Sequence, residues 1–115
     1  MIFGSHVILF STDADADREF LGRVFGLEHV DAGGGWLIFG LPPAEVAVHP
    51  EVTPGAQLYL MCDDLPAEIA RLTELGVQCS EVEEARWGSL TAIRMPGGGD
   101  LGLYQPRHPT MVEGR

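Results

Sequence analysis

The pattern of apolar and polar positions repeats between the two halves of the chain. Apolar runs at 5–11 and 57–62 each end at acidic residues. An amphipathic stretch follows each run and ends at a glycine, Gly26 in the first half and Gly76 in the second. Self-similarity at a fixed period indicates a repeated structural unit. The pattern therefore predicts two equal modules.

The repeat sets the predicted domain organisation of residues 1–115. The first module covers about 1–52 and the second about 53–106, followed by a loose polar tail at 107–115. The connector between the modules is short and contains two prolines, which is unlike a flexible linker between independent domains. We therefore expect one domain in which the modules pack against each other.

The first module is predicted to contain one helix and four strands. The predicted elements are a strand at 5–11, a helix from about Asp13 to Phe25, strands at 28–31 and 36–39, and a strand at 45–49. Asp13 can cap the helix because its carboxylate can accept from free N–H groups of the first turn. Asp15 and Asp17 also suit the positive N-terminal end of a helix. The glycine run at 33–35 joins two strands and opens no helix, which favours a hairpin turn over a phosphate loop.

The second module is predicted to repeat this order. Its elements are a strand at 57–62, a helix at 65–75 that Asp64 can cap, and strands at 77–82, 89–95 and 100–104. Each module is thus βαβββ, and the fold class is α+β. A helix covers one face of each small sheet, so the other face must be buried against the partner module or a ligand. We therefore expect a cleft between the modules.

Composition narrows the function classes. The net charge is −10, with 17 acidic residues against 7 basic ones, all of them arginine. Such a chain would repel phosphates, which argues against nucleic-acid binding. The absence of lysine excludes Schiff-base catalysis. The acidic charge can serve solubility, or it can attract cationic small molecules.

The sequence also bears on the compartment. No apolar run approaches the roughly 20 residues that span a bilayer. The N-terminus lacks the basic start and long apolar stretch of a secretion signal. We expect a cytoplasmic protein without a membrane partner. Cys62 and Cys79 are expected to be buried or half-buried thiols, since no CxxC motif is present.

Several motifs resemble those of the vicinal oxygen chelate superfamily. They are His6 at the start of the first strand, the segment 59–77, Trp87-Gly88, and the segment 95–106. This superfamily includes glyoxalase I, extradiol dioxygenases, fosfomycin-resistance enzymes and bleomycin-resistance proteins. The resemblance implies two βαβββ modules around a cleft, and a homodimer. It leaves open whether the modules pair within one chain or across two.

The resemblance also implies where a metal would bind. Family members hold a divalent cation with one residue from each of four strands, and the matching positions here are His6, Val46, Gln57 and Gly102. Val46 and Gly102 cannot coordinate a metal, which favours a protein without a metal cofactor. His49 alternates away from Val46 along the strand, so only a bulge would turn it inward. In the alternative, His6, Gln57 and His49 bind Ni, Zn, Mn or Fe.

Strand alternation also predicts the lining of the cleft. The predicted residues are His6, Ile8, Phe10, Val46, Val48, Gln57, Tyr59, Met61, Gly102 and Tyr104, with Trp87 at the rim. This mostly apolar and aromatic surface suits a small organic ligand. Alternatively, these residues simply form the interface between the modules.

Three hypotheses about function follow. The first is a metal-free small-molecule binding protein, of the kind that sequesters a drug, for an aromatic or cationic compound. The second is a divalent-metal-dependent lyase or dioxygenase. The third is a structural or regulatory interaction module whose cleft is filled by its own side chains.

Overall fold

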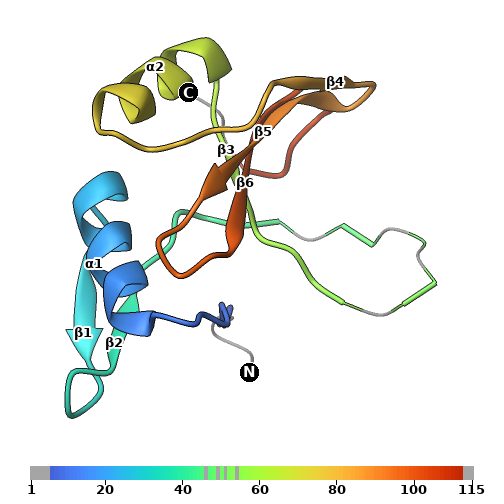
Figure 1. Cartoon of the computed structure of the whole chain (residues 1–115). Coiled ribbons are helices and arrows are strands. Elements are labelled where there is room, and N and C mark those ends of the chain that lie inside the picture. The colour runs from blue at the N-terminus through green and yellow to red at the C-terminus, as the bar shows by residue number, and fades with distance from the viewer. Residues whose placement is uncertain (1–5, 46, 49, 51, 54, 113–115) are drawn as a thin grey trace.

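The computed structural model describes residues 6–45, 47–48, 50, 52–53 and 55–112. Within these residues lie two helices and six strands (Figure 1). The elements are α1 (Ala14–Phe25), β1 (His29–Asp31), β2 (Leu37–Phe39), β3 (Tyr59–Met61), α2 (Leu65–Glu74), β4 (Glu83–Ala85), β5 (Gly88–Arg94) and β6 (Asp100–Pro106).

Both helices begin at the predicted caps. The Asp13 carboxylate accepts a hydrogen bond from the Ala16 N–H at 3.2 Å, and the Asp64 carboxylate accepts from the Ala67 N–H at 3.1 Å. Each bond satisfies a donor that has no partner inside the helix. Helix α1 ends at Gly26, which has a φ of 66°. These local signals were sufficient to place both helices.

The second module has the predicted βαβββ order. Its sheet has the strand order β3-β6-β5-β4, in which β3 and β6 run parallel and the other pairs antiparallel. The predicted α+β fold class is thereby confirmed for this half. The sheet gives the second module one face covered by helices and one that is not (Figure 1).

The segment 77–82, predicted as a strand, forms only an isolated bridge at Cys79, and the strand lies beyond a bulge, at Glu83–Ala85. The Ser80 N–H donates to the Ala92 carbonyl at 2.9 Å, and Cys79 bridges Ile93. From Cys79 to Glu83 the edge advances four residues, while β5 advances three, from Ile93 back to Leu90. One extra residue on an edge strand is a β-bulge, and it increases the local twist. Regular pairing resumes only at β4.

Helices α1 and α2 cover the same face of the four-stranded sheet (Figure 1). The buried residues between them form one hydrophobic cluster: Phe20, Val24, Leu65, Leu72, Val77, Ile93, Met95, Leu101 and Leu103. Each large side chain buried in this way contributes roughly 1.5–3 kcal/mol. Helix α1 from the first half therefore helps to build the core of the second.

Polar contacts also join α1 to the second module. The carboxylate of Asp17, only 8% exposed, accepts from the Gly97 N–H at 2.7 Å in the turn between β5 and β6. The Thr12 hydroxyl donates to the Gly97 carbonyl at 2.7 Å. The Arg71 guanidinium of α2 donates to the carbonyl of Val24 near the end of α1, at 3.1 Å. These bonds fix α1 on the sheet.

The first module departs from the prediction at its outer strands. The hairpin of β1 and β2 forms, and the glycines at 33–35 make its turn, as predicted. Residues 6–11 and residues 45, 47 and 48 form no strand, while residues 5, 46 and 49 lie outside the described residues. The predicted strands at 5–11 and 45–49 are therefore wrong for the parts described.

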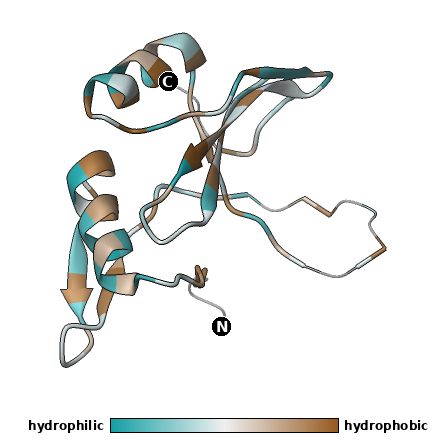
Figure 2. Ribbon diagram, in the orientation of Figure 1, coloured by the Kyte–Doolittle hydropathy of each residue, from teal (hydrophilic) through white to brown (hydrophobic). Residues whose placement is uncertain are grey.

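The physical reason is that no pairing partner for these segments lies among the residues that the structure describes. A strand is stable only when its backbone N–H and C=O groups pair with a neighbour, and apolar alternation alone does not supply one. The side chains of Ile8 and Phe10 are 67% and 92% exposed. Figure 2 shows hydrophobic residues along this segment before α1.

In the part of the chain that is described, none of the helices is long and apolar enough to cross a membrane.

Candidate functional site

The face of the four-stranded sheet opposite the helices is the candidate site, and we call it the open face. Leu103 of β6 points into the core, so Gly102 and Tyr104 lie on the opposite face by strand alternation. The parallel register sets Tyr59 beside Gly102 and Met61 beside Tyr104. The open face is therefore built around β3 and β6.

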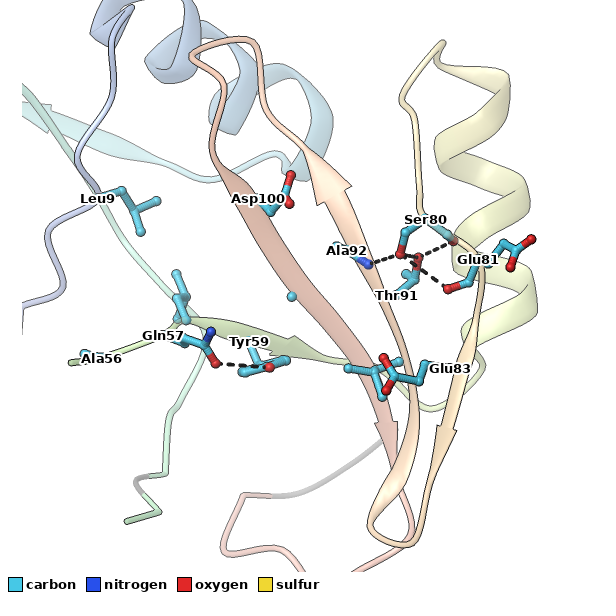
Figure 3. Close-up of a pocket in the computed structure, with 13 residues that line it drawn as sticks. Leu9, Ala56, Gln57, Tyr59, Ser80, Glu81, Glu83, Thr91, Ala92 and Asp100 are labelled. Carbon is cyan, nitrogen blue, oxygen red and sulfur yellow. Dashed lines mark hydrogen bonds between the residues drawn. The ribbon is translucent and has the colours of Figure 1, made fainter. Parts of the chain in front are cut away.

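A cavity of about 360 Å³ lies on the open face (Figure 3). Its lining comes from the sheet, the bulged edge and the N-terminal segment: Leu9, Ala56, Gln57, Leu58, Tyr59, Ser80, Glu81, Glu83, Leu90, Thr91, Ala92, Asp100 and Gly102. Three of these residues are acidic and none is basic. The size suits a small organic ligand, and the lining charge favours a cation over an anion.

Tyr59 occupies the centre of the open face. A β-carbon at Gly102 would lie 2.2 Å from Cδ1 of the Tyr59 ring, so the ring rests directly on the glycine backbone. The Tyr59 hydroxyl donates to the side-chain oxygen of Gln57 at 3.2 Å (Figure 3). The space that a side chain at position 102 would need is thus taken by an aromatic ring.

Next to this cavity, Tyr59, Trp87 and Tyr104 form what we call the aromatic cluster. The ring centroids of Trp87 and Tyr104 are 5.1 Å apart, and those of Tyr59 are 5.8 Å from Tyr104 and 6.2 Å from Trp87. All three pairs are edge-to-face, which is a favoured aromatic geometry. The cluster extends the cavity with an aromatic wall.

Tyr104 is neutral within this cluster. Burial raises the pKa of the Tyr104 hydroxyl, and the nearby Glu45 and Tyr59 raise it further. The hydroxyl lies 3.2 Å from Nε2 of His108, whose Nδ1 is 2.8 Å from the Pro109 carbonyl. An Nδ1–H that donates to this carbonyl leaves Nε2 to accept from Tyr104. The segment after β6 therefore contacts the aromatic cluster.

No family model matches the sequence, and no curated protein matches it. Several solved structures are similar to this chain. The antibiotic binding protein TnmS3 from Streptomyces sp. CB03234 is 29% identical, with a TM-score of 0.63, over 92% of this chain and 99% of that one. A glyoxalase/bleomycin resistance protein from Streptomyces sp. CB03234 is 27% identical, with a TM-score of 0.57, over 83% of this chain and 93% of that one. A lactoylglutathione lyase from Agrobacterium tumefaciens is 18% identical, with a TM-score of 0.60, over 84% and 88% of the two chains.

The chain has the vicinal oxygen chelate fold. The resemblance that the sequence motifs indicated is thereby confirmed, together with the α+β fold class of the glyoxalase/bleomycin resistance/dioxygenase proteins. The fold alone does not decide between binding and catalysis, because this superfamily contains both.

The residues predicted to line the cleft fall into two groups, and the first group lies in or beside the cavity. Gln57, Tyr59 and Gly102 line the cavity, and Trp87 and Tyr104 adjoin it through the aromatic cluster. Met61 shares the open face with Tyr104. Whether these residues bind a ligand stays a prediction.

The remaining predicted residues lie elsewhere or outside the described chain. His6, Ile8 and Phe10 belong to the exposed N-terminal segment, and from that segment it is Leu9 that reaches the cavity. Val48 is exposed as well. Val46 and His49 lie outside the described residues.

Sequence reasoning missed part of the cavity lining. Leu90 and Ala92 of β5 pair with Tyr104 and Gly102, so alternation along β5 could have found them. Glu83 pairs with Leu90 and shares its face, but the bulge between Cys79 and β4 shifts its register. No signal in the sequence indicated that bulge.

The described residues do not fit the four-ligand metal pattern of the superfamily. Within the described ranges there is no group of three or more His, Cys, Asp or Glu side chains placed to hold a metal ion. The side-chain oxygen of Gln57 accepts from Tyr59, and the Tyr59 ring fills the space at Gly102.

The two cysteines are half-buried, as predicted. Burial raises the pKa of the Cys62 thiol to about 11 and also raises that of Cys79. The Cys62 thiol donates to the Tyr104 carbonyl at 3.6 Å. Because the thiolate is the reactive form, neither cysteine is poised as a nucleophile at neutral pH.

Proposed function

We propose that this chain is a metal-free binding protein of the vicinal oxygen chelate superfamily that sequesters a planar aromatic cation. The observation that carries the proposal is the contact between Tyr59 and Gly102, because an aromatic ring stands where the superfamily places a metal-binding side chain. A ring at this position offers stacking and cation–π contact, and it offers no coordination.

The charge around the cavity supports a cationic ligand. Glu83 lies on the open face, and it has no ion-pair partner among the described residues. Asp100 is paired with Arg94 at 3.0 Å, so it contributes less net charge. The net charge of −10 adds a long-range attraction for cations.

The similarity to TnmS3 supports binding over catalysis. That protein is described as an antibiotic binding protein, and its likeness covers nearly all of both chains. The likeness to the lactoylglutathione lyase concerns the fold alone. The alternative, a metal-dependent lyase or dioxygenase using His6, Gln57 and His49, is tested by titration with Ni²⁺, Zn²⁺, Mn²⁺ and Fe²⁺. Tight stoichiometric binding that His6→Ala weakens would establish this alternative and overturn our proposal.

Two planar probes of similar size test the proposed ligand class. Proflavine is a tricyclic aromatic cation, and anthraquinone-2-sulfonate is a tricyclic aromatic anion. We expect proflavine to raise the melting temperature and to bind in calorimetry, because a ligand of the native state stabilises it. Anthraquinone-2-sulfonate should bind at least about 10-fold more weakly, given the charge of the cavity. Absence of proflavine binding, or equal binding of both probes, overturns the proposal.

Matched variants locate the site. Tyr59→Ala should weaken proflavine binding by roughly 3- to 10-fold, the effect of losing one aromatic contact. Glu83→Gln removes one negative charge on the open face, so it should weaken proflavine binding and should not weaken binding of the anion. Glu74→Gln, at the end of α2, is the control for net charge, and it should leave both probes unaffected.

We further propose that the protein is a cytoplasmic homodimer in which the segment 6–11 pairs with a second copy. The exposure of Ile8 and Phe10 supports this pairing, because an apolar run on the surface is unfavourable unless a partner covers it. Among the described residues, the backbone of this segment pairs with no strand, which supports pairing with an added strand.

A further inference from the structure

Arg107, directly after β6, reaches back to the turn between β4 and β5. Its guanidinium donates to the Ala85 carbonyl at 2.6 Å and to the Ser89 hydroxyl at 2.7 Å, and it pairs with the Glu84 carboxylate. The Ser89 hydroxyl in turn donates to Glu84 at 2.7 Å. The arginine thus contacts both strands beside the turn.

The same residue also holds the turn through its backbone. The Arg107 N–H donates to the Trp87 carbonyl at 2.8 Å. Trp87 lies in the two-residue turn between Ala85 and Gly88, which are paired across the hairpin. The Trp87 ring packs edge-to-face on Tyr104 and Tyr59. The position of the turn therefore sets the position of this wall of the aromatic cluster.

The hydrogen bonds of the Arg107 side chain hold the turn through their geometry more than through charge attraction. The side chains of Arg107 and Glu84 are 46% and 64% exposed, and an exposed ion pair contributes little to stability. The Ser89 and Arg107 hydrogen bonds lower the pKa of Glu84, so the carboxylate stays charged and accepting. A planar guanidinium can reach several acceptors at fixed angles, whereas a lysine ammonium cannot reproduce this fork.

We propose that Arg107 is a positioning residue that fixes the Trp87 turn and thereby shapes the ligand-binding open face. The role in ligand binding rests on the proposed function, while the placement of Trp87 does not. Neither Arg107 nor Trp87 is part of the cavity lining, so Arg107 acts on a ligand through the Trp87 ring and its edge-to-face contact with Tyr59, which lines the cavity.

The first experiment measures Trp87 in the full chain without any ligand. The chain has two tryptophans, so Trp36→Phe makes Trp87 the single reporter. In this background, Arg107→Ala should shift the emission to longer wavelength and raise acrylamide quenching by about two-fold, because the turn that carries Trp87 loses its side-chain bonds to Ala85, Glu84 and Ser89 on the flanking strands, while the backbone bond to Trp87 remains. Arg107→Lys should not restore the parent values. Arg23→Ala, which removes an ion-paired arginine from α1, is the matched control.

The second experiment measures proflavine binding by the same variants, with circular dichroism and melting temperature recorded for each. We expect Arg107→Ala and Arg107→Lys to weaken proflavine by roughly 3- to 10-fold. Glu84→Gln removes the charged partner of Arg107 but keeps the arginine, so it should change the quenching of Trp87 less. This variant tests the positioning role even if Arg107→Ala fails to fold.

The possible outcomes separate the two proposals. Unchanged quenching in Arg107→Ala and Glu84→Gln overturns the positioning role. If quenching changes in the Arg107→Ala variant but the parent protein does not bind proflavine, the proposed function is overturned. The placement of Trp87 by Arg107 then still stands. Changed quenching with unchanged proflavine affinity overturns the link from Trp87 to the ligand.

Discussion

The ring of Tyr59 lies on the backbone of Gly102 in the neighbouring parallel strand, so close that a β-carbon at position 102 would stand 2.2 Å from the ring. Any side chain at position 102 must displace the ring. Tyr59 also packs on Trp87 and Tyr104, so displacing it disturbs the whole aromatic cluster. The glycine is therefore a requirement of the open face.

The first prediction concerns this glycine. Gly102→Ala should lower the free energy of unfolding by about 1–3 kcal/mol, the usual cost of inserting a group into a packed site. Denaturant unfolding measures the change. Gly55→Ala is the control, because a β-carbon there would meet no atom within 4 Å. Equal stability of the two variants would contradict the packing of Tyr59 on Gly102.

The second prediction concerns the bond between Asp17 and Gly97. Asp17→Ala leaves the Gly97 N–H without its acceptor and should lower the free energy of unfolding by about 1–3 kcal/mol. Asp15→Ala, which removes only an exposed ion pair with Arg18, should change it by less than about 1 kcal/mol. Thermal or urea unfolding of both variants provides the measurement. A smaller loss of stability in Asp17→Ala than in Asp15→Ala would contradict the role of the Asp17–Gly97 hydrogen bond.

The third prediction is a pH dependence at Cys62. Its folded pKa of about 11 lies above the ordinary thiol value, so the folded protein keeps the proton while the unfolded chain releases it. The contribution of Cys62 to stability is therefore complete below the ordinary thiol pKa and is lost as the pH rises through about 11.

Thiol reactivity tests this shift directly. At pH 8 iodoacetamide should alkylate Cys62 about 100-fold more slowly than it alkylates a free thiol, because the thiolate is the reactive form. Cys79→Ser isolates the signal, and the protein in urea provides the reference rate. Equal rates in the folded and unfolded protein would disprove the effect of burial.

The fourth prediction concerns chelation. If the protein binds its ligand without a metal, then dialysis against EDTA should leave the proflavine affinity unchanged, and elemental analysis should find less than about 0.1 equivalent of Ni, Zn, Mn or Fe. An affinity that falls on dialysis and returns with one of these ions would support the metal-dependent alternative.

The fifth prediction concerns the segment 6–11. Ile8→Ser should shift the protein from dimer to monomer in sedimentation experiments, because it removes apolar surface that we assign to the contact between copies. Val82→Ser changes another exposed apolar residue outside the segment and should leave the assembly unchanged. A parent protein that sediments as a monomer at high concentration would contradict the proposed homodimer.

The sequence predicted the elements that depend on local signals. The helix starts at Asp13 and Asp64 were correct because a cap acts on its own next turn. The segment 6–11 has the same alternation as a strand but pairs with no strand among the described residues, and a local pattern does not report on pairing. Asp17 looked like a helix-end charge, and its real partner lies 80 residues away.

The candidate site was predictable only in part. Strand alternation places Gly102 and Tyr104 on one face, and the parallel register of β3 and β6 sets Tyr59 beside Gly102 on that face, as expected. The sequence indicated that Gly102 cannot coordinate a metal, but it did not indicate that the Tyr59 ring packs on this glycine. The placement of Glu83 depends on a bulge, and the Trp87 turn accepts a hydrogen bond from the Arg107 backbone 20 residues later; both are tertiary features.

The packing of α1 on the second sheet means that the duplicated unit of the sequence is not the unit that folds. Phe20 and Val24 are encoded in the first half, yet they complete the core of the second half. A polypeptide divided at the connector would yield two fragments that each need the other to become ordered. Any recombination that exchanges one half of this chain must therefore preserve the fit between α1 and the foreign sheet.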